Sequence, residues 1–236
     1  MSDTASEKKR VLLVGATGLV GRSVITRSID MSQFALQGLA RSEMQFPDGA
    51  RMELVLADSE DWGEVVKMIA PEAVICALGT TIKKAGSEEA FRAVDHDLVM
   101  DVARAAKAAG TTGFVYVSSV GADTGSRNFY LRTKGEVERD LKALKFRRLD
   151  ILRPGLLRGQ RRGDARFLEG IGQVAAPVAD LFLQGSYSKF RSIRASDLAA
   201  AALQCVREKP AGQFIHEHEG LKRLIAKLDK SEGSGK

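Results

Sequence analysis

The sequence predicts a doubly wound α/β fold, in which helices wrap both sides of a parallel sheet, with a small C-terminal cap. Two observations carry this prediction. Short apolar runs alternate with longer segments of helical periodicity, and the runs are rich in Val, Leu and Ile with little polar alternation, as in strands covered on both faces. The runs are VLLVG (11–15), FALQGLA (34–40), MELVLA (52–57), AVICALG (73–79), FVYVSS (114–119) and LDILRP (149–154).

The segments between these runs have apolar residues at helical spacing. In 87–110 the spaced residues are Phe91, Val94, Leu98, Val102, Ala105 and Ala109. Gly110 can end that helix in a left-handed conformation. Residues 129–145 predict a second clear helix. The part after about Gly155 holds a basic loop, an apolar helix near 167–183, the segment SDLAAAALQCV and a final strand GQFIHEH. We therefore expect one domain over 1–236, with 1–9 and about 230–236 disordered.

Composition favours a cytoplasmic protein with no membrane span. The two cysteines, Cys76 and Cys205, lie far apart in apolar segments and indicate buried thiols in a reducing compartment. The N-terminal residues MSDTASEKKR contain no apolar signal segment, and no apolar run approaches the roughly 18 residues of a span.

The net charge of +6 raises the question of nucleic-acid binding. The basic residues are dispersed along the chain, and no helix-turn-helix, zinc-finger or aromatic-plus-basic pattern accompanies them. Such an excess is typical of solvated surface with at most one anionic ligand, so we expect no nucleic-acid partner.

The stretch VLLVGATGLVGRSVI predicts a phosphate-binding loop between a strand and a helix. Gly15, Gly18 and Gly21 give the pattern Gly-x-x-Gly-x-x-Gly, with Thr17, Leu19 and Val20 completing the loop. Glycines suit the tight turn, the close approach of a pyrophosphate and the helix–sheet contact, while the helix N-terminus attracts phosphate. At the first strand–helix junction of an alternating chain, this pattern indicates dinucleotide binding in a Rossmann-like fold; the alternative is a purely structural turn.

Residues after the next strands favour NADP(H) over NAD(H). Arg41 stands where NAD-preferring sites carry an acidic residue, and its guanidinium can bind a 2′-phosphate. A solvated arginine at a strand end is the alternative. Asp58 follows the third strand and can reach the adenine or cap the following helix. Leu78 and Gly79 end the fourth strand at the carboxyl edge, where ligands of such sheets bind.

The segment FYLRTKGEVE places Tyr130 and Lys134 one helical turn apart. With Val137, Leu141 and Leu144 they form one stripe, so Lys134 faces the sheet, where a buried ammonium needs a partner. Gly135, unfavourable within a helix, predicts a close contact there. The preceding strand ends in Ser118–Ser119, so serine, tyrosine and lysine can converge near the nicotinamide.

Together these motifs resemble the short-chain dehydrogenase/reductase superfamily in its shorter, atypical branch. LGTTIKKAGSEEAFRAVDHD, VSSVGADTGSRNFYLRTKGEVE and RPGLLRG are similar to the HIV Tat-interacting protein family of NADPH-binding oxidoreductase-like proteins. The resemblance covers most of the chain from Val11 to about Gly159.

The resemblance implies roles for individual residues. Tyr130 is expected to be the general acid–base, Lys134 to hold the nicotinamide ribose and make the phenol more acidic, and Ser119 to orient the substrate carbonyl. Pro154 and Gly155 are expected to flank the nicotinamide. Two features depart from the superfamily: Ser119 and Tyr130 are only eleven residues apart, and Asp95 occupies the helix position often held by a structural Asn.

Two function classes follow from this site. The first is an NADPH-dependent carbonyl reductase, or an epimerase-like relative that uses the same residues on a small carbonyl substrate. The second is a non-catalytic NADPH-binding sensor that acts through a protein partner. Intact Ser119, Tyr130 and Lys134 favour the enzyme.

Three further patterns have ordinary explanations. His216 and His218 lie near each other, but no cysteine or carboxylate cluster is evident beside them in sequence, so we expect no metal site. A basic loop of Arg158, Arg161, Arg162 and Arg166 is read as solvated charge, with an anionic substrate tail as the alternative. The stripe in GLKRLIAKL predicts a docked C-terminal helix and not a membrane anchor.

Overall fold

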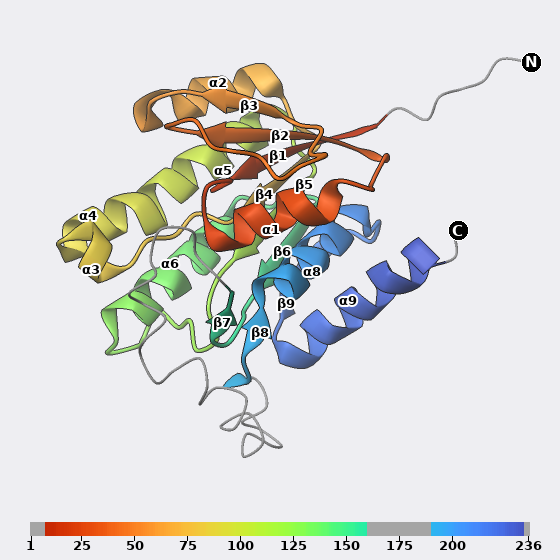
Figure 1. The fold of residues 1–236 in the computed structure, drawn as a ribbon. Coiled ribbons are helices and arrows are strands. Elements are labelled where there is room, and N and C mark those ends of the chain that lie inside the picture. Colours follow the sequence, from red (N-terminus) through yellow and green to blue (C-terminus); the bar gives the residue numbers. More distant parts are fainter. Residues whose placement is uncertain (1–7, 160–189, 234–236) are drawn as a thin grey trace, which may run out of the picture.

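The computed structural model describes residues 8–159 and 190–233. A seven-stranded sheet with the order β3-β2-β1-β4-β5-β6-β9 forms its centre, and every neighbouring pair of strands is parallel (Figure 1). The strands are β1 (Lys9–Val14), β2 (Phe34–Ala40), β3 (Glu53–Leu56), β4 (Ala73–Cys76), β5 (Gly113–Val117), β6 (Arg148–Leu152) and β9 (Gly212–His216). The order runs outward in both directions from β1 and β4, so the predicted doubly wound α/β fold is confirmed.

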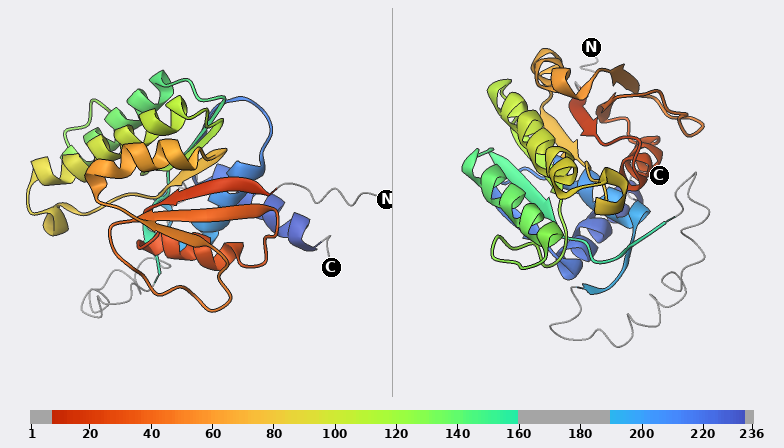
Figure 2. Two further views of the ribbon diagram at one scale, coloured as in Figure 1. Left: turned by 90° about the horizontal axis from the view of Figure 1, so that it is seen from above. Right: turned by 90° about the vertical axis from the view of Figure 1, so that its left-hand side faces the viewer.

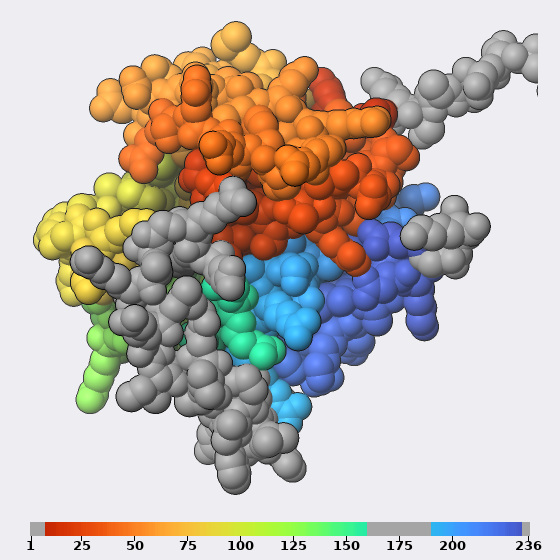
Figure 3. Space-filling model, in the orientation of Figure 1, coloured from red at the N-terminus to blue at the C-terminus, as the bar shows by residue number. Residues whose placement is uncertain are grey.

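Helices cover both faces of the sheet (Figure 2). One face carries α1 (Leu19–Ser28), α8 (Ala195–Arg207) and α9 (His218–Gly233); the other carries α2 (Trp62–Ile69), α5 (Leu98–Ala108) and α6 (Phe129–Ala143). The space-filling view shows α8 in light blue beside α1 in red, with α9 in darker blue on the other side of α8 (Figure 3). Alternate residues of β1 enter different cores: Val11 and Leu13 face α1 and α8, whereas Leu12 and Val14 face α2 and α5.

The edge strands correct one expectation. The continuous apolar runs predict strands covered on both faces, and the four central strands β1, β4, β5 and β6 are largely buried. In β3, however, Leu56 is 46% exposed, and in β9 Ile215 is 44% exposed. An outer strand has a neighbour on one side only, so its side chains are covered incompletely even when they are apolar.

The helix expected over 87–110 is interrupted. The chain forms α3 (Ile82–Ala85), α4 (Glu88–Arg92), a π-helical turn η2 (Ala93–Asp97) and then α5, after which Gly110 is left-handed as predicted, with φ +85°. A π-turn inserts one residue and rotates the following helix face by about 100°. Asp95 and His96 within the turn are thereby buried.

The C-terminal part contributes more to the main fold than the sequence indicates. Helix α8 lies within the principal core and β9 is the seventh strand of the sheet, which leaves the two-stranded pair β7 (Leu157–Arg158) and β8 (Ile193–Arg194) as a small addition. The apolar helix expected near 167–183 lies outside the described residues, as do three of the four arginines of the basic loop, Arg158 being the exception.

The disorder expected at the ends is wrong in part. Lys9 begins β1, and α9 continues through residues 230–233. The tail is ordered because Leu221, Leu224 and Leu228 of α9 are buried against the core, which also confirms the predicted docked helix. Among the described residues, no helix is long and apolar enough to cross a membrane.

Substitution of two helical glycines tests how α6 is packed. A Cβ on Gly135 would lie 2.4 Å from the Asp123 carbonyl carbon, the close contact that the sequence predicts, whereas a Cβ on Gly63 in α2 would meet nothing within 4 Å. Gly135→Ala should therefore lower the free energy of unfolding by about 1–3 kcal/mol despite the better helix propensity of alanine. The matched Gly63→Ala should leave it unchanged or raise it. Urea unfolding of both variants checks this, and equal effects would contradict it.

Candidate functional site

The glycine loop is held in a shape that only glycine permits at two of its three positions. Gly15 has φ +91°, and a Cβ there would lie 2.6 Å from the Ala77 carbonyl oxygen. A Cβ on Gly21 would lie 2.2 Å from the Gly15 carbonyl oxygen. Both glycines are thus needed to bring the start of α1 against the ends of β1 and β4.

Gly18 differs, because its conformation is open to other residues. It has φ −75° and ψ 170° at the N-cap of α1, and a Cβ there would meet only the Gly15 oxygen, at 3.3 Å. The first turn of α1 carries no acidic residue, and no side chain caps it. The loop therefore leaves a helix N-terminus free for an anionic group, and a methyl group at Gly18 would narrow the approach to it. Residues Thr17, Leu19 and Val20 lie in the same loop and first turn, as predicted for contacts to a dinucleotide.

A chain of close contacts leads from the glycine loop to Lys134. The Gly15 position touches the backbone of Ala77 and Leu78, which follow β4. A Cβ on Gly79 would lie 3.5 Å from Asp95 Oδ1 and 4.0 Å from Lys134 Nζ. Leu78 is half-buried and Gly79 is exposed at the carboxyl edge of the sheet. The structure thus brings the predicted phosphate loop and the predicted lysine to neighbouring strand ends.

Lys134 is buried and makes an ion pair that the sequence prediction missed. Its Nζ lies 3.0 Å from Asp95 Oδ1, with the two side chains 4% and 0% exposed. The ammonium also donates a hydrogen bond of 3.1 Å to the Tyr116 hydroxyl. Asp95 Oδ2 in turn accepts a hydrogen bond of 2.7 Å from the Thr80 N–H. The only signal in sequence was the presence of Asp95 where the superfamily often has Asn.

The surroundings of Lys134 fix the charge states of this cluster. Burial would lower the pKa of the Lys134 ammonium, but the Tyr116 hydroxyl, which accepts its hydrogen bond, and the Asp95 carboxylate hold that pKa above its ordinary value. Burial also raises the pKa of the Tyr116 phenol, and it raises the pKa of the Cys76 thiol to about 11. At neutral pH the cluster therefore contains a charged lysine beside a neutral phenol and a neutral thiol.

Tyr130 is half-buried one turn before Lys134 on α6. Its ring packs edge-on against Phe91 of α4, with 5.8 Å between the ring centroids. Its hydroxyl makes no hydrogen bond to another described residue, whereas the phenol that contacts Lys134 directly is Tyr116. The Tyr130 hydroxyl is therefore available to a ligand, while Tyr116 is fully enclosed in the core.

The two serines after β5 have different surroundings. Ser118 is buried and donates a hydrogen bond of 2.5 Å to Glu138 Oε1. Glu138 is itself paired with Arg153, whose Nη2 lies 2.6 Å from Oε2. Ser119 is half-buried, and among the described residues its hydroxyl makes one hydrogen bond, which it donates to the Val120 carbonyl at 3.3 Å. The hydroxyl of the predicted residue, Ser119, is thus held less firmly than that of Ser118.

Pro154 and Gly155 follow β6 beside these serines. The Pro154 carbonyl accepts a hydrogen bond of 2.9 Å from the Val120 N–H, which joins the ends of β5 and β6. A Cβ on Gly155 would lie 2.4 Å from the Arg191 carbonyl oxygen, so this glycine admits the chain that enters β8. The packing of the chain near Arg191 therefore explains why position 155 is a glycine, and no bound ligand is needed to explain it.

On the other side of β1, Arg41 and Asp58 are exposed at the strand ends. Asp58 takes the N-cap position of the short 3₁₀ turn η1 (Ser59–Asp61) but forms no capping hydrogen bond. Arg22, which the sequence analysis did not single out, donates from α1 to the carbonyls of Thr17 (3.2 Å) and Gln45 (3.3 Å). It ties the glycine loop to the segment that follows Arg41.

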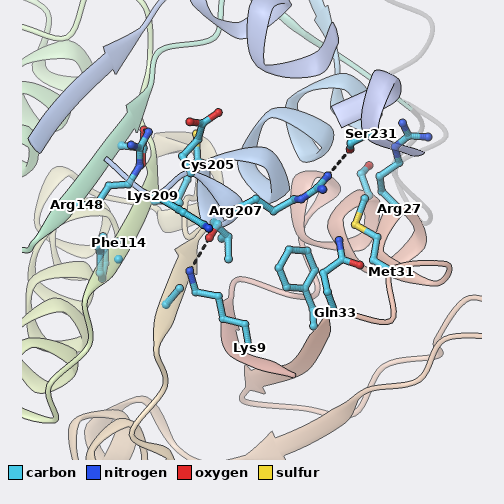
Figure 4. A pocket seen from close by; sticks show the side chains of 18 of the residues that line it. Lys9, Arg27, Met31, Gln33, Phe114, Arg148, Cys205, Arg207, Lys209 and Ser231 are labelled. Carbon is cyan, nitrogen blue, oxygen red and sulfur yellow. Dashed lines mark hydrogen bonds and ion pairs between the residues drawn. The ribbon is translucent and has the colours of Figure 1, made fainter. Parts of the chain in front are cut away.

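The cavity shown in Figure 4 lies at the opposite, amino edge of the sheet. It has a volume of about 1720 Å³ and is bordered by the starts of five strands, at Lys9, Phe34, Ala73, Gly113 and Arg148. Lys9 Nζ donates to the Val206 carbonyl near the end of α8, at 2.6 Å, and so compensates a helix C-terminus. The lining also includes Leu19 and Arg22 of α1, so the cavity borders the first turn of α1 as well as the amino edge of the sheet.

Asp150, Cys205 and His216 meet near this cavity, with ligand-type atoms within 4.8 Å of one another. The structure therefore supplies the cysteine and carboxylate that were not evident beside His216 in sequence. Asp150 accepts two hydrogen bonds from Arg148 (2.6 and 2.7 Å) and one from His216 (2.7 Å). These three bonds satisfy the carboxylate, so the cluster is explained as a buried hydrogen-bond network beside the Cys205 thiol.

Comparisons with known proteins agree with this geometry. Residues 15–209 match the family described as NAD(P)H-binding. Protein FMP52, mitochondrial, of Meyerozyma guilliermondii is 39% identical over 68% of this chain and 70% of its own length. Its namesakes in Emericella nidulans and Candida albicans are 38% and 32% identical; the alignments cover 75% and 86% of this chain and 82% and 90% of those proteins. The expected cytoplasmic location is contradicted by these relatives, which are named as mitochondrial proteins.

Solved structures share the fold at low sequence identity. UDP-glucose 4-epimerase of Thermotoga maritima has a TM-score of 0.66 and 15% identity, over 96% of this chain and 84% of its own. ADP-L-glycero-D-manno-heptose-6-epimerase of Helicobacter pylori has a TM-score of 0.67 and 12% identity, over 97% and 84%. These similarities support the Rossmann-like fold.

Gly18→Ala tests whether the loop is shaped for a dinucleotide. Because the backbone at Gly18 suits alanine and the new methyl group meets one atom, the free energy of unfolding should change by less than about 1 kcal/mol. Affinity for NADPH should fall about tenfold or more, because the methyl group would stand in the path of the pyrophosphate. Calorimetry and urea unfolding measure the two quantities. Unchanged affinity in the stable variant would contradict the assignment.

Proposed function

The chain belongs to the NAD(P)H-binding family, and from this premise we propose that it is an NADPH-dependent oxidoreductase of the atypical short-chain dehydrogenase/reductase type. The proposed substrate is a small carbonyl compound. The alternative reaction at the same residues is epimerase-like. One observation carries the proposal: the carboxyl edge that holds the glycine cradle also holds an available Tyr130 hydroxyl, the less firmly held Ser119 hydroxyl and a charged Lys134.

In the proposed reaction the carbonyl oxygen takes its proton from the Tyr130 hydroxyl, while the Ser119 hydroxyl donates a hydrogen bond to the same oxygen. When bound, the reduced nicotinamide supplies the hydride for the carbonyl carbon, so the C=O group becomes an alcohol. Lys134 stabilises the phenolate that Tyr130 leaves behind and binds the nicotinamide ribose. Asp58, Leu78 and Pro154 complete the proposed cofactor contacts.

The preference for NADPH is proposed from two arginines. Arg41 is exposed at the end of β2 and has no ion pair with another described residue. Arg22 is anchored between the glycine loop and the segment after Arg41. A 2′-phosphate placed beside the second strand would meet these guanidinium groups, and no acidic residue in the first turn of α1 opposes it.

A non-catalytic NADPH sensor is the second candidate, and one observation favours it. The ammonium of Lys134 contacts Tyr116 and Asp95, both inside the protein, so the lysine has a structural role without any acid–base chemistry at Tyr130. In this alternative a protein partner reads the cofactor-bound state, in keeping with the resemblance to the HIV Tat-interacting protein family.

Two substitutions in α6 separate the candidates. Tyr130→Phe keeps the ring contact with Phe91, so NADPH affinity should stay within about twofold, while NADPH oxidation against a panel of carbonyl compounds should fall by roughly 10²–10⁴. Lys134→Met should reduce both turnover and affinity. If a substrate is found and Tyr130→Phe retains full activity on it, the catalytic assignment is wrong.

Arg41→Ala tests the cofactor preference. Loss of a charge-assisted contact of about 1.5–3 kcal/mol should weaken NADPH binding roughly ten- to a hundredfold and leave NADH binding unchanged. Arg104→Ala is the matched control, because Arg104 is an exposed arginine paired with Asp101 on α5. Calorimetry with both cofactors gives the comparison. Equal losses for NADPH and NADH, or an equal effect of Arg104→Ala, would reject the role of Arg41.

A further inference from the structure

Burial of the ion pair of Asp95 and Lys134 removes two charges from water, and polar contacts within the protein must compensate this loss of hydration free energy. Both side chains are nearly inaccessible to solvent, and an unpaired charge in such a place costs several kcal/mol. The described residues provide three direct polar contacts: the ion pair itself, the hydrogen bond from the Thr80 N–H to Asp95, and the hydrogen bond from Lys134 to the Tyr116 hydroxyl. The positions of both charged groups are therefore fixed by buried polar partners, unlike those of an ion pair on the surface.

Three local features place the pair under the carboxyl edge. The π-helical turn η2 rotates Asp95 inward, and such turns are frequent at functional sites. The backbone of Gly79 lies close to the pair, because a Cβ there would be 3.5 Å from Asp95 Oδ1 and 4.0 Å from Lys134 Nζ, both ordinary contacts. The third is the position of Lys134 on the buried face of α6. A salt bridge that served only to stabilise the core would not need a place at the cofactor edge.

We propose that Asp95 is a positioning residue of the cofactor site, whose carboxylate keeps Lys134 charged in a buried place and holds its ammonium at the carboxyl edge beneath Gly79. A dinucleotide ribose bound there would then meet a cation throughout the physiological pH range. This inference rests on the proposed cofactor role of Lys134. It assigns to Asp95 an electrostatic function of its own, carried out through the lysine.

No other described group can replace the carboxylate. The titratable groups that face Lys134 are Tyr116 of β5, Cys76 of β4 and Tyr130 of α6. Burial raises the pKa values of Tyr116 and Cys76, so both are neutral at physiological pH. Glu138, one turn further along α6, is taken by Arg153 and Ser118. Asp95 is thus the one anion in the described residues that the lysine contacts.

Removal of the carboxylate has a definite pH signature. In Asp95→Asn the ammonium stays buried without an anion, so its pKa should fall well below the roughly 10.4 of an unfolded lysine. Between those two values the unfolded chain binds one proton more than the folded chain. The free energy of unfolding must then rise with pH in this interval. In the parent protein the Lys134 pKa lies above its ordinary value, so this group gives no such rise.

The experiment measures NADPH affinity by calorimetry and stability by urea unfolding from about pH 6 to about pH 9. For Asp95→Asn, the dissociation constant relative to the parent should increase about tenfold or more across this range as Lys134 loses its proton, while the variant becomes more stable. If Asp95→Asn is folded only at the alkaline end of this range, its stability still rises with pH, as the proposal expects. A merely structural defect would weaken binding by one factor at every pH.

Three matched variants complete the test. Lys134→Met leaves Asp95 buried without a cation, so its stability should fall as pH rises, the mirror image of Asp95→Asn. The double variant Asp95→Asn/Lys134→Met carries neither charge and should show neither trend. Tyr116→Phe removes a hydrogen bond but no anion and should bind NADPH with the pH dependence of the parent.

The proposal is overturned if Asp95→Asn follows the parent at all pH values, if its loss of affinity is independent of pH, or if its pH dependence survives in the double variant. Neither measurement requires turnover. A non-catalytic protein would show no NADPH oxidation for Tyr130→Phe to reduce, but Asp95→Asn would still change the pH dependence of NADPH affinity and stability. Failure of the proposed reaction and failure of this inference are therefore distinguishable.

Discussion

A charged lysine buried against the sheet is the constraint on which the site depends. Lys134 can remain an ammonium there only because Asp95 lies 3.0 Å away and the Tyr116 hydroxyl accepts its hydrogen bond. Several otherwise unrelated features follow from this requirement. The helix before α5 breaks into a π-turn that buries Asp95, and the chain after β4 passes over the pair at Gly79, where no side chain intervenes.

The parallel sheet turns this local arrangement into a site. All seven strands end at the same edge, so the glycine loop after β1, the Gly79 segment after β4, Ser119 after β5 and Pro154 after β6 become neighbours without any special connection between them. The cavity at the amino edge is lined by the starts of strands, by α1 and by the end of α8, where Lys9 Nζ donates to the Val206 carbonyl. Chemistry of the family type is therefore proposed at the carboxyl edge alone.

Sequence reasoning succeeded where one local signal determines the structure. Runs of Val, Leu and Ile located the strands within a few residues, Gly110 ended α5 as expected, and the helical stripe placed Lys134 against the sheet. Sequence reasoning failed where the structure depends on a contact between residues that are distant in the sequence. The partner of Lys134 lies 39 positions earlier in the chain, the π-turn leaves no periodic trace, and Arg22 gains its role only when Gln45 folds back to it. The cytoplasmic location was inferred from composition, which does not determine the cellular compartment. Relatives named as mitochondrial proteins contradict it.

The central claim is that a buried, charged Lys134 forms part of the dinucleotide site. Nitrogen-15 NMR of the lysine ammonium groups, with Lys134 assigned from the spectrum of Lys134→Met, tests it most directly. The account predicts one ammonium signal protected from exchange with water at neutral pH, which changes its chemical shift when NADPH is added. A neutral amine at position 134, or an ammonium signal that saturating NADPH leaves unmoved, would contradict it.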